Sequence, residues 1–514
     1  AHAQTSAVAA AVLRAAGGSS PVPVPPDPAD RRFADAAWER NPSWFLLRQS
    51  YLLACRLGES LVDAADVDEP TRRKARFLLG GLLDAASPTN LLPTNPGALK
   101  AAFDSGGASV VQGWRNFLRD LAENRGQPRQ VVPGAMAVGR DLATTPGKVV
   151  FRNDLVELLQ YAPQTDTVHE VPLFISPPWI NKYYLMDLAP GRSLVEWAVR
   201  QGHTVFALSY RNPDQTMSGV TLDDYLLQGP RAALDVIRDI TGSEKVDLVG
   251  LCLGGTLTAA LLAWLDAVGD DRVHTATLIN TLVDFAEPGD LGVFTDEATV
   301  ARLERRMQRE GFLKGESMRG TFDAMRARDL LWSYAVQGWL FGEDPQTFDI
   351  LAWNADSTRM PAGMHSFYLR SCYLENALAE GRMELAGRRL DLGRVRQDVY
   401  CVAAEQDHIA LWRSVYSGIR RLGGEVRFVL SNAGHVAAVV NPPHPKARHW
   451  AKDSALLPDD PDAWLAAATE RRETWWEDWA RWLAERAGTR REAPPLGSDA
   501  YPVLGDAPGT YVST

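Results

Sequence analysis

The stretch that decides the fold is Lys245–Val268, KVDLVGLCLGGTLTAALLAWLDAV. Its first seven residues, Lys245–Leu251, form a short apolar run that predicts a buried β-strand. The residues from Thr256 onward have the apolar pattern of a helix. Cys252 lies between them, flanked by glycines. It is either a packed core side chain, as most free cysteines are, or a displayed nucleophile.

A strand, a G-x-C-x-G turn and a helix together match the nucleophile elbow, the sharp turn that raises a nucleophile above the sheet of an α/β-hydrolase fold. Gly250 and Gly254 suit such a turn because side chains there would collide with the crossing strand and helix. The helix N-terminus behind Cys252 favours a thiolate, and the backbone N–H of Leu253 is placed to face a developing oxyanion. The motif therefore predicts a reactive thiol if an acid and a base accompany it.

Short apolar runs recur on both sides of this motif and alternate with helix-like stretches such as residues 193–201 and 229–240. This alternation predicts βαβ units and a parallel sheet covered on both faces, hence an α/β class. The six runs span residues 171–178, 204–210, 245–251, 273–280, 399–407 and 426–435.

Two polar side chains end the last two of these runs. Asp407 ends VYCVAAEQD and His435 ends VRFVLSNAGH. Both follow Cys252 in the order nucleophile, acid, histidine that an α/β-hydrolase requires, and both fall where parallel sheets bind their ligands. Cys252, Asp407 and His435 are therefore the predicted catalytic triad. His408 is assigned a supporting role, because an acid and a base on consecutive residues rarely point at one another.

The remaining composition divides the chain. We expect an Ala- and Pro-rich arm over 1–32, a helical N-terminal domain over 33–134 and a catalytic domain over 135–514. Within the last, residues 281–387 contain no convincing strand but many aromatic residues. This insertion is interpreted as a helical subdomain with its own core, as an apolar cap over the active site, or as both.

Charge and composition exclude several classes of protein. The 514 residues carry a formal net charge of −10, which argues against nucleic-acid binding. No apolar run is long enough for a transmembrane helix, and no ligand cluster indicates a metal or redox cofactor. The four cysteines have no metal-like spacing and fit a reducing cytoplasm, which is the expected location.

Sulfur in place of oxygen at the elbow changes the chemistry. A cysteine forms a thioester intermediate, which stays activated for transfer of the acyl group to an alcohol. If the substrate is itself a thioester, transfer of its acyl group to the cysteine is nearly thermoneutral. His435 would deprotonate both the thiol and the attacking hydroxyl. Two alternatives remain open: a cysteine-dependent α/β hydrolase of the dienelactone hydrolase or thioesterase kind, and a non-catalytic scaffold that keeps the hydrolase sheet.

Longer motifs make the chain similar to one family. SPTNLLPTNP at 87–96, PPWINKYYLMDL at 177–188, GLCLGGT at 250–256 and EQDHIALW at 405–412 resemble the polyhydroxyalkanoate synthases, most closely those of class I. The sequence departs from the family's pattern at Tyr210 and Leu411 and within ARDLLWSY, residues 327–334. None of these departures touches the predicted triad.

The resemblance implies that the protein polymerises (R)-3-hydroxyacyl-CoA, chiefly 3-hydroxybutyryl-CoA and other short-chain monomers, with release of coenzyme A. It also implies a second oxyanion N–H from Ile180, a supporting place for His408 and a mobile lid over 281–387. Coenzyme A thioester is then substrate and not cofactor. The expected partners are the growing polyester, a second copy in a homodimer and the polymer granule surface.

Overall fold

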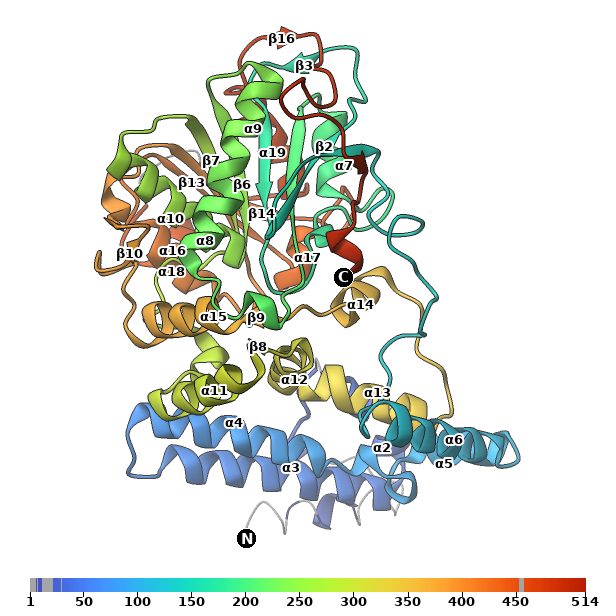
Figure 1. Cartoon of the computed structure of the whole chain (residues 1–514). Coiled ribbons are helices and arrows are strands. Elements are labelled where there is room, and N and C mark those ends of the chain that lie inside the picture. The colour runs from blue at the N-terminus through green and yellow to red at the C-terminus, as the bar shows by residue number, and fades with distance from the viewer. Residues whose placement is uncertain (1–5, 7, 12–21, 29, 453–456) are drawn as a thin grey trace. The chain divides into compact units, whose positions relative to one another are not determined.

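The computed structural model describes Ser6 and residues 8–11, 22–28, 30–452 and 457–514. The chain divides into two compact units. One combines Ala1–Pro133 with Gly320–Thr347, and the other combines Gly134–Arg319 with Phe348–Thr514 (Figure 1). Much of the expected arm over 1–32 lies outside the described residues. Among the residues described, no helix has both the length and the apolar character needed to cross a membrane.

The first unit is built from helices, and capping residues in the sequence mark where several of them begin. Asn41, Asp68 and Asn95 each cap a helix by accepting a hydrogen bond from a backbone N–H of its first turn, and a proline follows each cap within two residues. The helices are α2 (Ala37–Arg40), α3 (Pro42–Asp63), α4 (Glu69–Ala85), α5 (Pro96–Asp104) and α6 (Ala108–Glu123). The expected helical N-terminal region is confirmed.

Part of the aromatic-rich interval packs within this first unit. Trp339 donates a hydrogen bond from Nε1 to Asp120 Oδ2 of α6 at 2.9 Å, and Asn116 Nδ2 donates to the Gly338 carbonyl at 3.0 Å. A Cβ atom at Gly113 would lie 2.0 Å from the Trp339 carbonyl oxygen. Only glycine at position 113 allows the two segments to approach so closely.

The second unit is organised around an eleven-stranded sheet with the order β15-β14-β13-β12-β7-β6-β4-β5-β2-β1-β17. Its six central strands are parallel and correspond to the six predicted runs. They are β4 (Leu173–Ser176), β5 (Val205–Tyr210), β6 (Val246–Leu251), β7 (Val273–Ile279), β12 (Asp398–Ala404) and β13 (Val426–Ser431). The flanking strands are antiparallel: β1 (Gly147–Arg152), β2 (Val156–Tyr161), β14 (His449–Ala451), β15 (Thr469–Arg471) and β17 (Gly505–Asp506).

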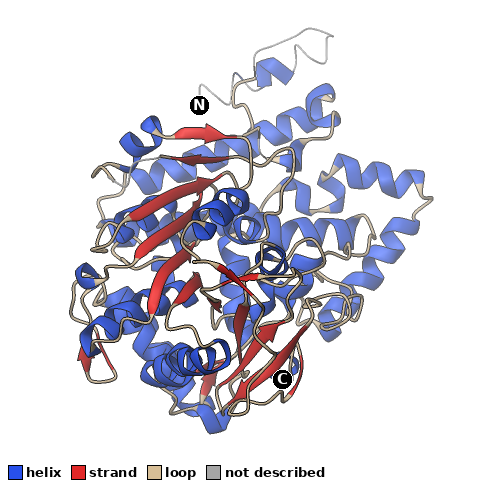
Figure 2. Cartoon of the chain, turned by 90° about the horizontal axis from the view of Figure 1, so that it is seen from above, coloured by secondary structure: helices blue, strands red, loops and turns tan. Residues whose placement is uncertain are grey.

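Alternate residues of each central strand enter two different cores, because successive side chains of a strand point to opposite faces. In β6, Val246 and Leu248 join one apolar cluster, and Val249 and Leu251 join the other. Helices cover both faces, as Figure 2 shows. The first cluster includes α9 (Ala232–Thr241), α10 (Leu253–Val268) and α16 (Trp412–Ile419), and the second includes α7 (Leu194–Arg200) and α19 (Trp475–Ala484). The expected α/β-hydrolase architecture is confirmed.

The remaining helices of this unit include α8 (Leu222–Leu226), α11 (Glu297–Glu310), α14 (Asp349–Ala355), α15 (Ala362–Tyr368), α17 (His435–Val439) and α18 (Pro461–Ala467). Helix α12 (Gly315–Met325) begins in this unit and ends in the first one. The interval 281–387 contains only two-residue strands, such as β8 (Phe312–Leu313) and β9 (Met360–Pro361).

Candidate active site

Cys252 stands at the turn between β6 and α10. Its backbone has φ 51° and ψ −117°, a conformation that L-residues rarely adopt and that stores strain. The Cys252 N–H donates to the Ile279 carbonyl at 2.9 Å, which fixes the turn against β7. Its side chain is half-buried and packs against both apolar clusters. The thiol is therefore held at the carboxyl edge of the sheet rather than inside one core.

Three glycines make this turn possible. A Cβ atom at Gly250 would lie 2.6 Å from Gly255 Cα, and one at Gly255 would lie 1.9 Å from Thr281 Oγ1. A Cβ atom at Gly254 would lie 2.2 Å from the Ser176 carbonyl oxygen and 2.5 Å from the Pro177 carbonyl carbon. Each contact is shorter than real Cβ atoms show, so a side chain at any of these glycines would displace a neighbouring segment.

Asp407 and His435 meet beside this turn. Asp407 follows β12, and His435 is the first residue of α17, after β13. Asp407 Oδ2 lies 2.6 Å from His435 Nδ1. The other oxygen, Oδ1, accepts hydrogen bonds from the backbone N–H groups of Ile409 and Ala410 at 2.8 and 2.9 Å. Both carboxylate oxygens are thus used, and the free ring nitrogen of His435 is left for the thiol.

The electrostatics of His435 favour its charged form. Burial alone would lower the pKa of its imidazole, but the hydrogen-bonded Asp407 carboxylate and the neighbouring Cys252 raise it well above the ordinary value. His435 is therefore protonated at neutral pH in this arrangement.

The structure also places His408 and a residue that the sequence analysis missed. His408 is half-buried, and the histidine that meets Asp407 is His435, not its neighbour. Asn280, directly after β7, donates from Nδ2 to the His435 carbonyl at 2.6 Å and so anchors the histidine. Asn280 could have been predicted by the pattern that identified Asp407, a polar residue at the end of a buried strand.

The loop 177–182 borders the elbow. It follows β4, and its start at Ser176–Pro177 is the segment that Gly254 approaches most closely. Ile180, in this loop, is half-buried. Leu253 is the first residue of α10, where helix geometry leaves its N–H without an intrahelical acceptor. The two predicted oxyanion donors thus belong to the two segments that touch at Gly254.

Two tyrosines of the aromatic interval lie near the thiol. The Tyr368 hydroxyl donates a hydrogen bond to the Tyr373 hydroxyl at 3.2 Å. Burial raises the pKa of both phenols, and Cys252 is among the neighbouring groups that raise it further. Tyr373 was not singled out in the sequence because aromatic density alone does not distinguish a ring that faces a site from one that fills a core.

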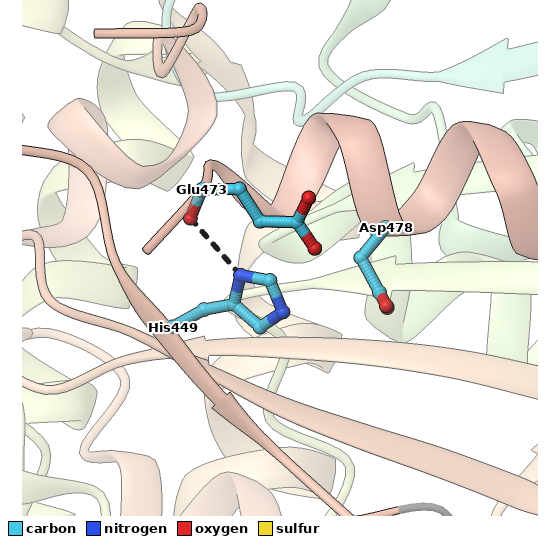
Figure 3. A group of neighbouring side chains, drawn as sticks. All are labelled: His449, Glu473 and Asp478. Atoms are coloured by element: carbon cyan, nitrogen blue, oxygen red, sulfur yellow. Dashed lines mark hydrogen bonds between the residues drawn. The ribbon is translucent and has the colours of Figure 1, made fainter. Parts of the chain in front are cut away.

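One group of side chains has metal-like spacing among the described residues: His449, Glu473 and Asp478 (Figure 3). Asp478, however, accepts hydrogen bonds from Arg427, Arg471 and Tyr400, and the Glu473 carboxylate pairs with Arg481. Three guanidinium groups already neutralise these carboxylates and disfavour a cation. The cluster joins α19 to β12, β13 and β15 as an ionic network.

These features define a class: an α/β-hydrolase-fold protein whose elbow carries cysteine, with an aspartate and a histidine hydrogen-bonded beside it. Two family models match the chain: one supports this class of fold, and the other indicates a particular family within it. Residues 29–198 match the N-terminal region of poly-beta-hydroxybutyrate polymerase, and residues 186–442 match the alpha/beta hydrolase fold.

The chain belongs to the poly(3-hydroxyalkanoate) polymerase family. A polymerase from Methylorubrum extorquens is 46% identical over 507 residues, which cover 98% of this chain and 84% of that protein. The polymerase subunit from Cupriavidus necator is 42% identical over 94% of this chain and 83% of its own length. The resemblance read from the sequence is confirmed, and the protein is an enzyme of the acyltransferase type, a polyester polymerase.

Similar solved structures are more distant. A 2-hydroxy-6-oxo-6-phenylhexa-2,4-dienoate hydrolase from Rhodococcus is 16% identical, with a TM-score of 0.30 over 57% of this chain and 93% of its own. A hydrolase from Pseudomonas aeruginosa is 14% identical, with a TM-score of 0.34 over 58% of this chain and 94% of its own. These scores are low, and the fold assignment rests on the family model and the sheet topology.

Proposed function

We propose that the protein forms polyhydroxyalkanoate by passing (R)-3-hydroxyacyl groups from coenzyme A through a thioester on Cys252. The Cys252 thiolate attacks the thioester carbonyl, the carbon–sulfur bond to coenzyme A breaks, and His435 returns its proton to the departing thiolate. A 3-hydroxyl group then attacks the enzyme thioester, and His435 accepts the hydroxyl proton. Each cycle lengthens the polyester by one monomer and restores the thiol.

The observation that carries this proposal is the hydrogen bond between Asp407 and His435, together with the contribution of Cys252 to the raised pKa of His435. A buried carboxylate 2.6 Å from His435 Nδ1 fixes the orientation of the ring and stabilises the imidazolium. The N–H groups of Leu253 and Ile180 serve as the oxyanion donors, because both segments meet at the elbow. His408 supports the Asp407 loop.

Transfer rather than hydrolysis requires that water be kept from the thioester. Tyr373 and Phe367, from the interval 281–387, pack against the same apolar cluster as Cys252. We assign this interval the role of a lid. Short monomers, such as 3-hydroxybutyryl-CoA, are the proposed substrates, with coenzyme A entering as part of the substrate.

The N-terminal helices are proposed to hold the protein on the polymer surface. Leu57, Leu61, Leu78 and Leu82 are more than half exposed, in pairs one turn apart on α3 and α4. Phe103, at the end of α5, is 86% exposed. Exposed apolar residues in this number mark an interaction surface. The product polyester is apolar and forms beside the enzyme, so a granule surface and a second copy of the chain are the proposed partners.

The direct test is incubation of the purified protein with 3-hydroxybutyryl-CoA. We expect release of free thiol together with insoluble polyester, and loss of both in Cys252→Ala. Free 3-hydroxybutyrate as the main product would contradict the transferase assignment and favour a hydrolase. Full thiol release by Cys252→Ala would place the nucleophile elsewhere.

A further inference from the structure

Lys182 is a buried cation that the proposed chemistry does not use. It lies at the end of the loop 177–182, two residues after Ile180, with 9% of its surface exposed. Burying an ammonium group is costly unless acceptors surround it. Its Nζ donates to the Val512 carbonyl at 2.5 Å and to the Thr514 carbonyl at 3.2 Å, and lies 3.1 Å from Asp356 Oδ1.

The partner carboxylate is itself fixed. Asp356 Oδ2 accepts a hydrogen bond from the Tyr184 hydroxyl at 2.9 Å, so one carboxylate joins both ends of the segment 182–184. Burial raises the pKa of Tyr184, which keeps its hydroxyl protonated and able to donate. Asp356 follows α14, the first helix after the chain returns to the second unit at Phe348.

The segment 353–358 makes further hydrogen bonds to the loop 177–182. Trp353 donates from Nε1 to the Lys182 carbonyl at 2.8 Å. Thr358 Oγ1 accepts from the Asn181 N–H at 2.8 Å and donates to the Trp179 carbonyl at 3.1 Å. These bonds bracket Ile180 on both sides. They fix the backbone on either side of the proposed oxyanion donor.

The loop needs this support because its backbone is strained. Asn181, between Ile180 and Lys182, has φ 62°, in the left-handed region that non-glycine residues seldom adopt. Such a conformation persists only when surrounding contacts enforce it. The orientation of the Ile180 peptide is therefore set by its neighbours rather than by its own preference.

We propose that Lys182 is a positioning residue: it ties the loop 177–182 to Asp356 and to the segment 512–514, and so holds the Ile180 N–H where the oxyanion forms. This inference rests on the proposed function, since it assigns the loop a role in acyl transfer. Lys182 acts through Ile180 and touches neither substrate nor thiol. Its loss should therefore slow chemistry more than it weakens binding.

The test compares Lys182→Met with Lys148→Met, a matched control. Lys148 also pairs with a carboxylate near the end of the chain, Asp506, but on β1 at the far edge of the sheet. For each variant, kcat and KM are measured by thiol release from 3-hydroxybutyryl-CoA. Misplacing an oxyanion donor costs on the order of tenfold to a hundredfold in rate. We expect such a loss of kcat in Lys182→Met, with KM little changed, and none in Lys148→Met.

A second measurement separates positioning from general damage. Alkylation of Cys252 by iodoacetamide requires the thiolate but no oxyanion donor, so its rate should be unchanged in Lys182→Met. A parallel fall of kcat and alkylation, or an unchanged kcat, would overturn the proposal. If Lys182→Met does not fold, Asp356→Asn applies the same test, because the carbonyls of Val512 and Thr514 still hold the ammonium.

The proposed function fails in a different way. If Cys252→Ala keeps its thiol release, or if alkylation of Cys252 leaves activity intact, the thiol is not the nucleophile, whatever the Lys182 variants do. If those two controls behave as expected and Lys182→Met matches the wild type, only the positioning role is wrong.

Discussion

At the scale of single residues, the site depends on one buried contact, that between Asp407 Oδ2 and His435 Nδ1. The carboxylate raises the pKa of His435 and so favours the imidazolium form of the ring. Because the carboxylate accepts two backbone N–H groups through Oδ1, it cannot turn away from the ring. The acid therefore tunes the base as well as orienting it.

Asp407→Asn tests this tuning. The amide carries no charge, so the pKa of His435 should fall toward that of an ordinary histidine. We expect slower alkylation of Cys252 at pH 7 and an altered pH profile, because a neutral imidazole no longer favours an anionic sulfur beside it. Chain elongation should be impaired more than acyl loading. Identical pH profiles for variant and wild type would contradict the role given to Asp407.

At the scale of elements, the strand–turn–helix unit of β6 and α10 determines where the thiol stands. Gly254 allows the first turn of α10 to contact the Ser176–Pro177 backbone. This contact fixes the elbow and the loop 177–182 relative to each other. The same loop is also hydrogen-bonded to the segment 353–358. The site is therefore assembled by three segments that are remote in the chain.

Gly254→Ala should separate these segments. The added methyl group would lie 2.2 Å from the Ser176 carbonyl, so we expect a fall in melting temperature and nearly complete loss of thiol release. Gly80→Ala is the control, since Gly80 lies within α4 with open space around its Cβ position. That change should stabilise the helix by about 0.5–1 kcal/mol and leave activity unchanged. An active Gly254→Ala enzyme would refute the close approach.

The helices α3 and α4 carry a separate prediction. Leu78 and Leu82 are 64% and 69% exposed, so replacing both with glutamine removes apolar surface without opening a core. We expect the double variant to keep its initial rate of thiol release but to sediment less with the polymer. Unchanged sedimentation, or a change only in the oligomeric state measured by light scattering, would exclude these leucines from polymer contact.

At the scale of the whole molecule, much of the plan was predictable from the sequence. The β6–α10 elbow, Asp407 and His435 follow from local patterns, because parallel strands bring their carboxyl ends to one edge. Contacts between distant segments were not predictable. Asn116 and Gly338 are joined by a hydrogen bond although they lie 222 positions apart. Lys182 donates a hydrogen bond to the Val512 carbonyl, although nothing in the sequence around it distinguishes it from an ordinary surface lysine. Such pairs depend on packing that no local pattern encodes.

Buried histidines give the whole molecule a predictable sensitivity to acid. His203 stacks on His169 with ring centroids 4.5 Å apart, and burial lowers its pKa to about 3. The unfolded chain binds a proton at this position below about pH 6.5, whereas the folded protein does not until about pH 3. Stability should therefore fall as the pH falls through this window. His203→Phe should flatten the decline in melting temperature between pH 6.5 and 4; an unaltered slope would show that His203 does not contribute to it.

The most direct test of the central claim is to find where the acyl group sits during turnover. The enzyme is mixed with 3-hydroxybutyryl-CoA, quenched in acid within one turnover and digested, and the peptides are analysed by mass spectrometry. The account predicts a 3-hydroxybutyryl group on the peptide that contains Cys252, absent in Cys252→Ala. Release of coenzyme A with the acyl group on another residue, or on none, would contradict it.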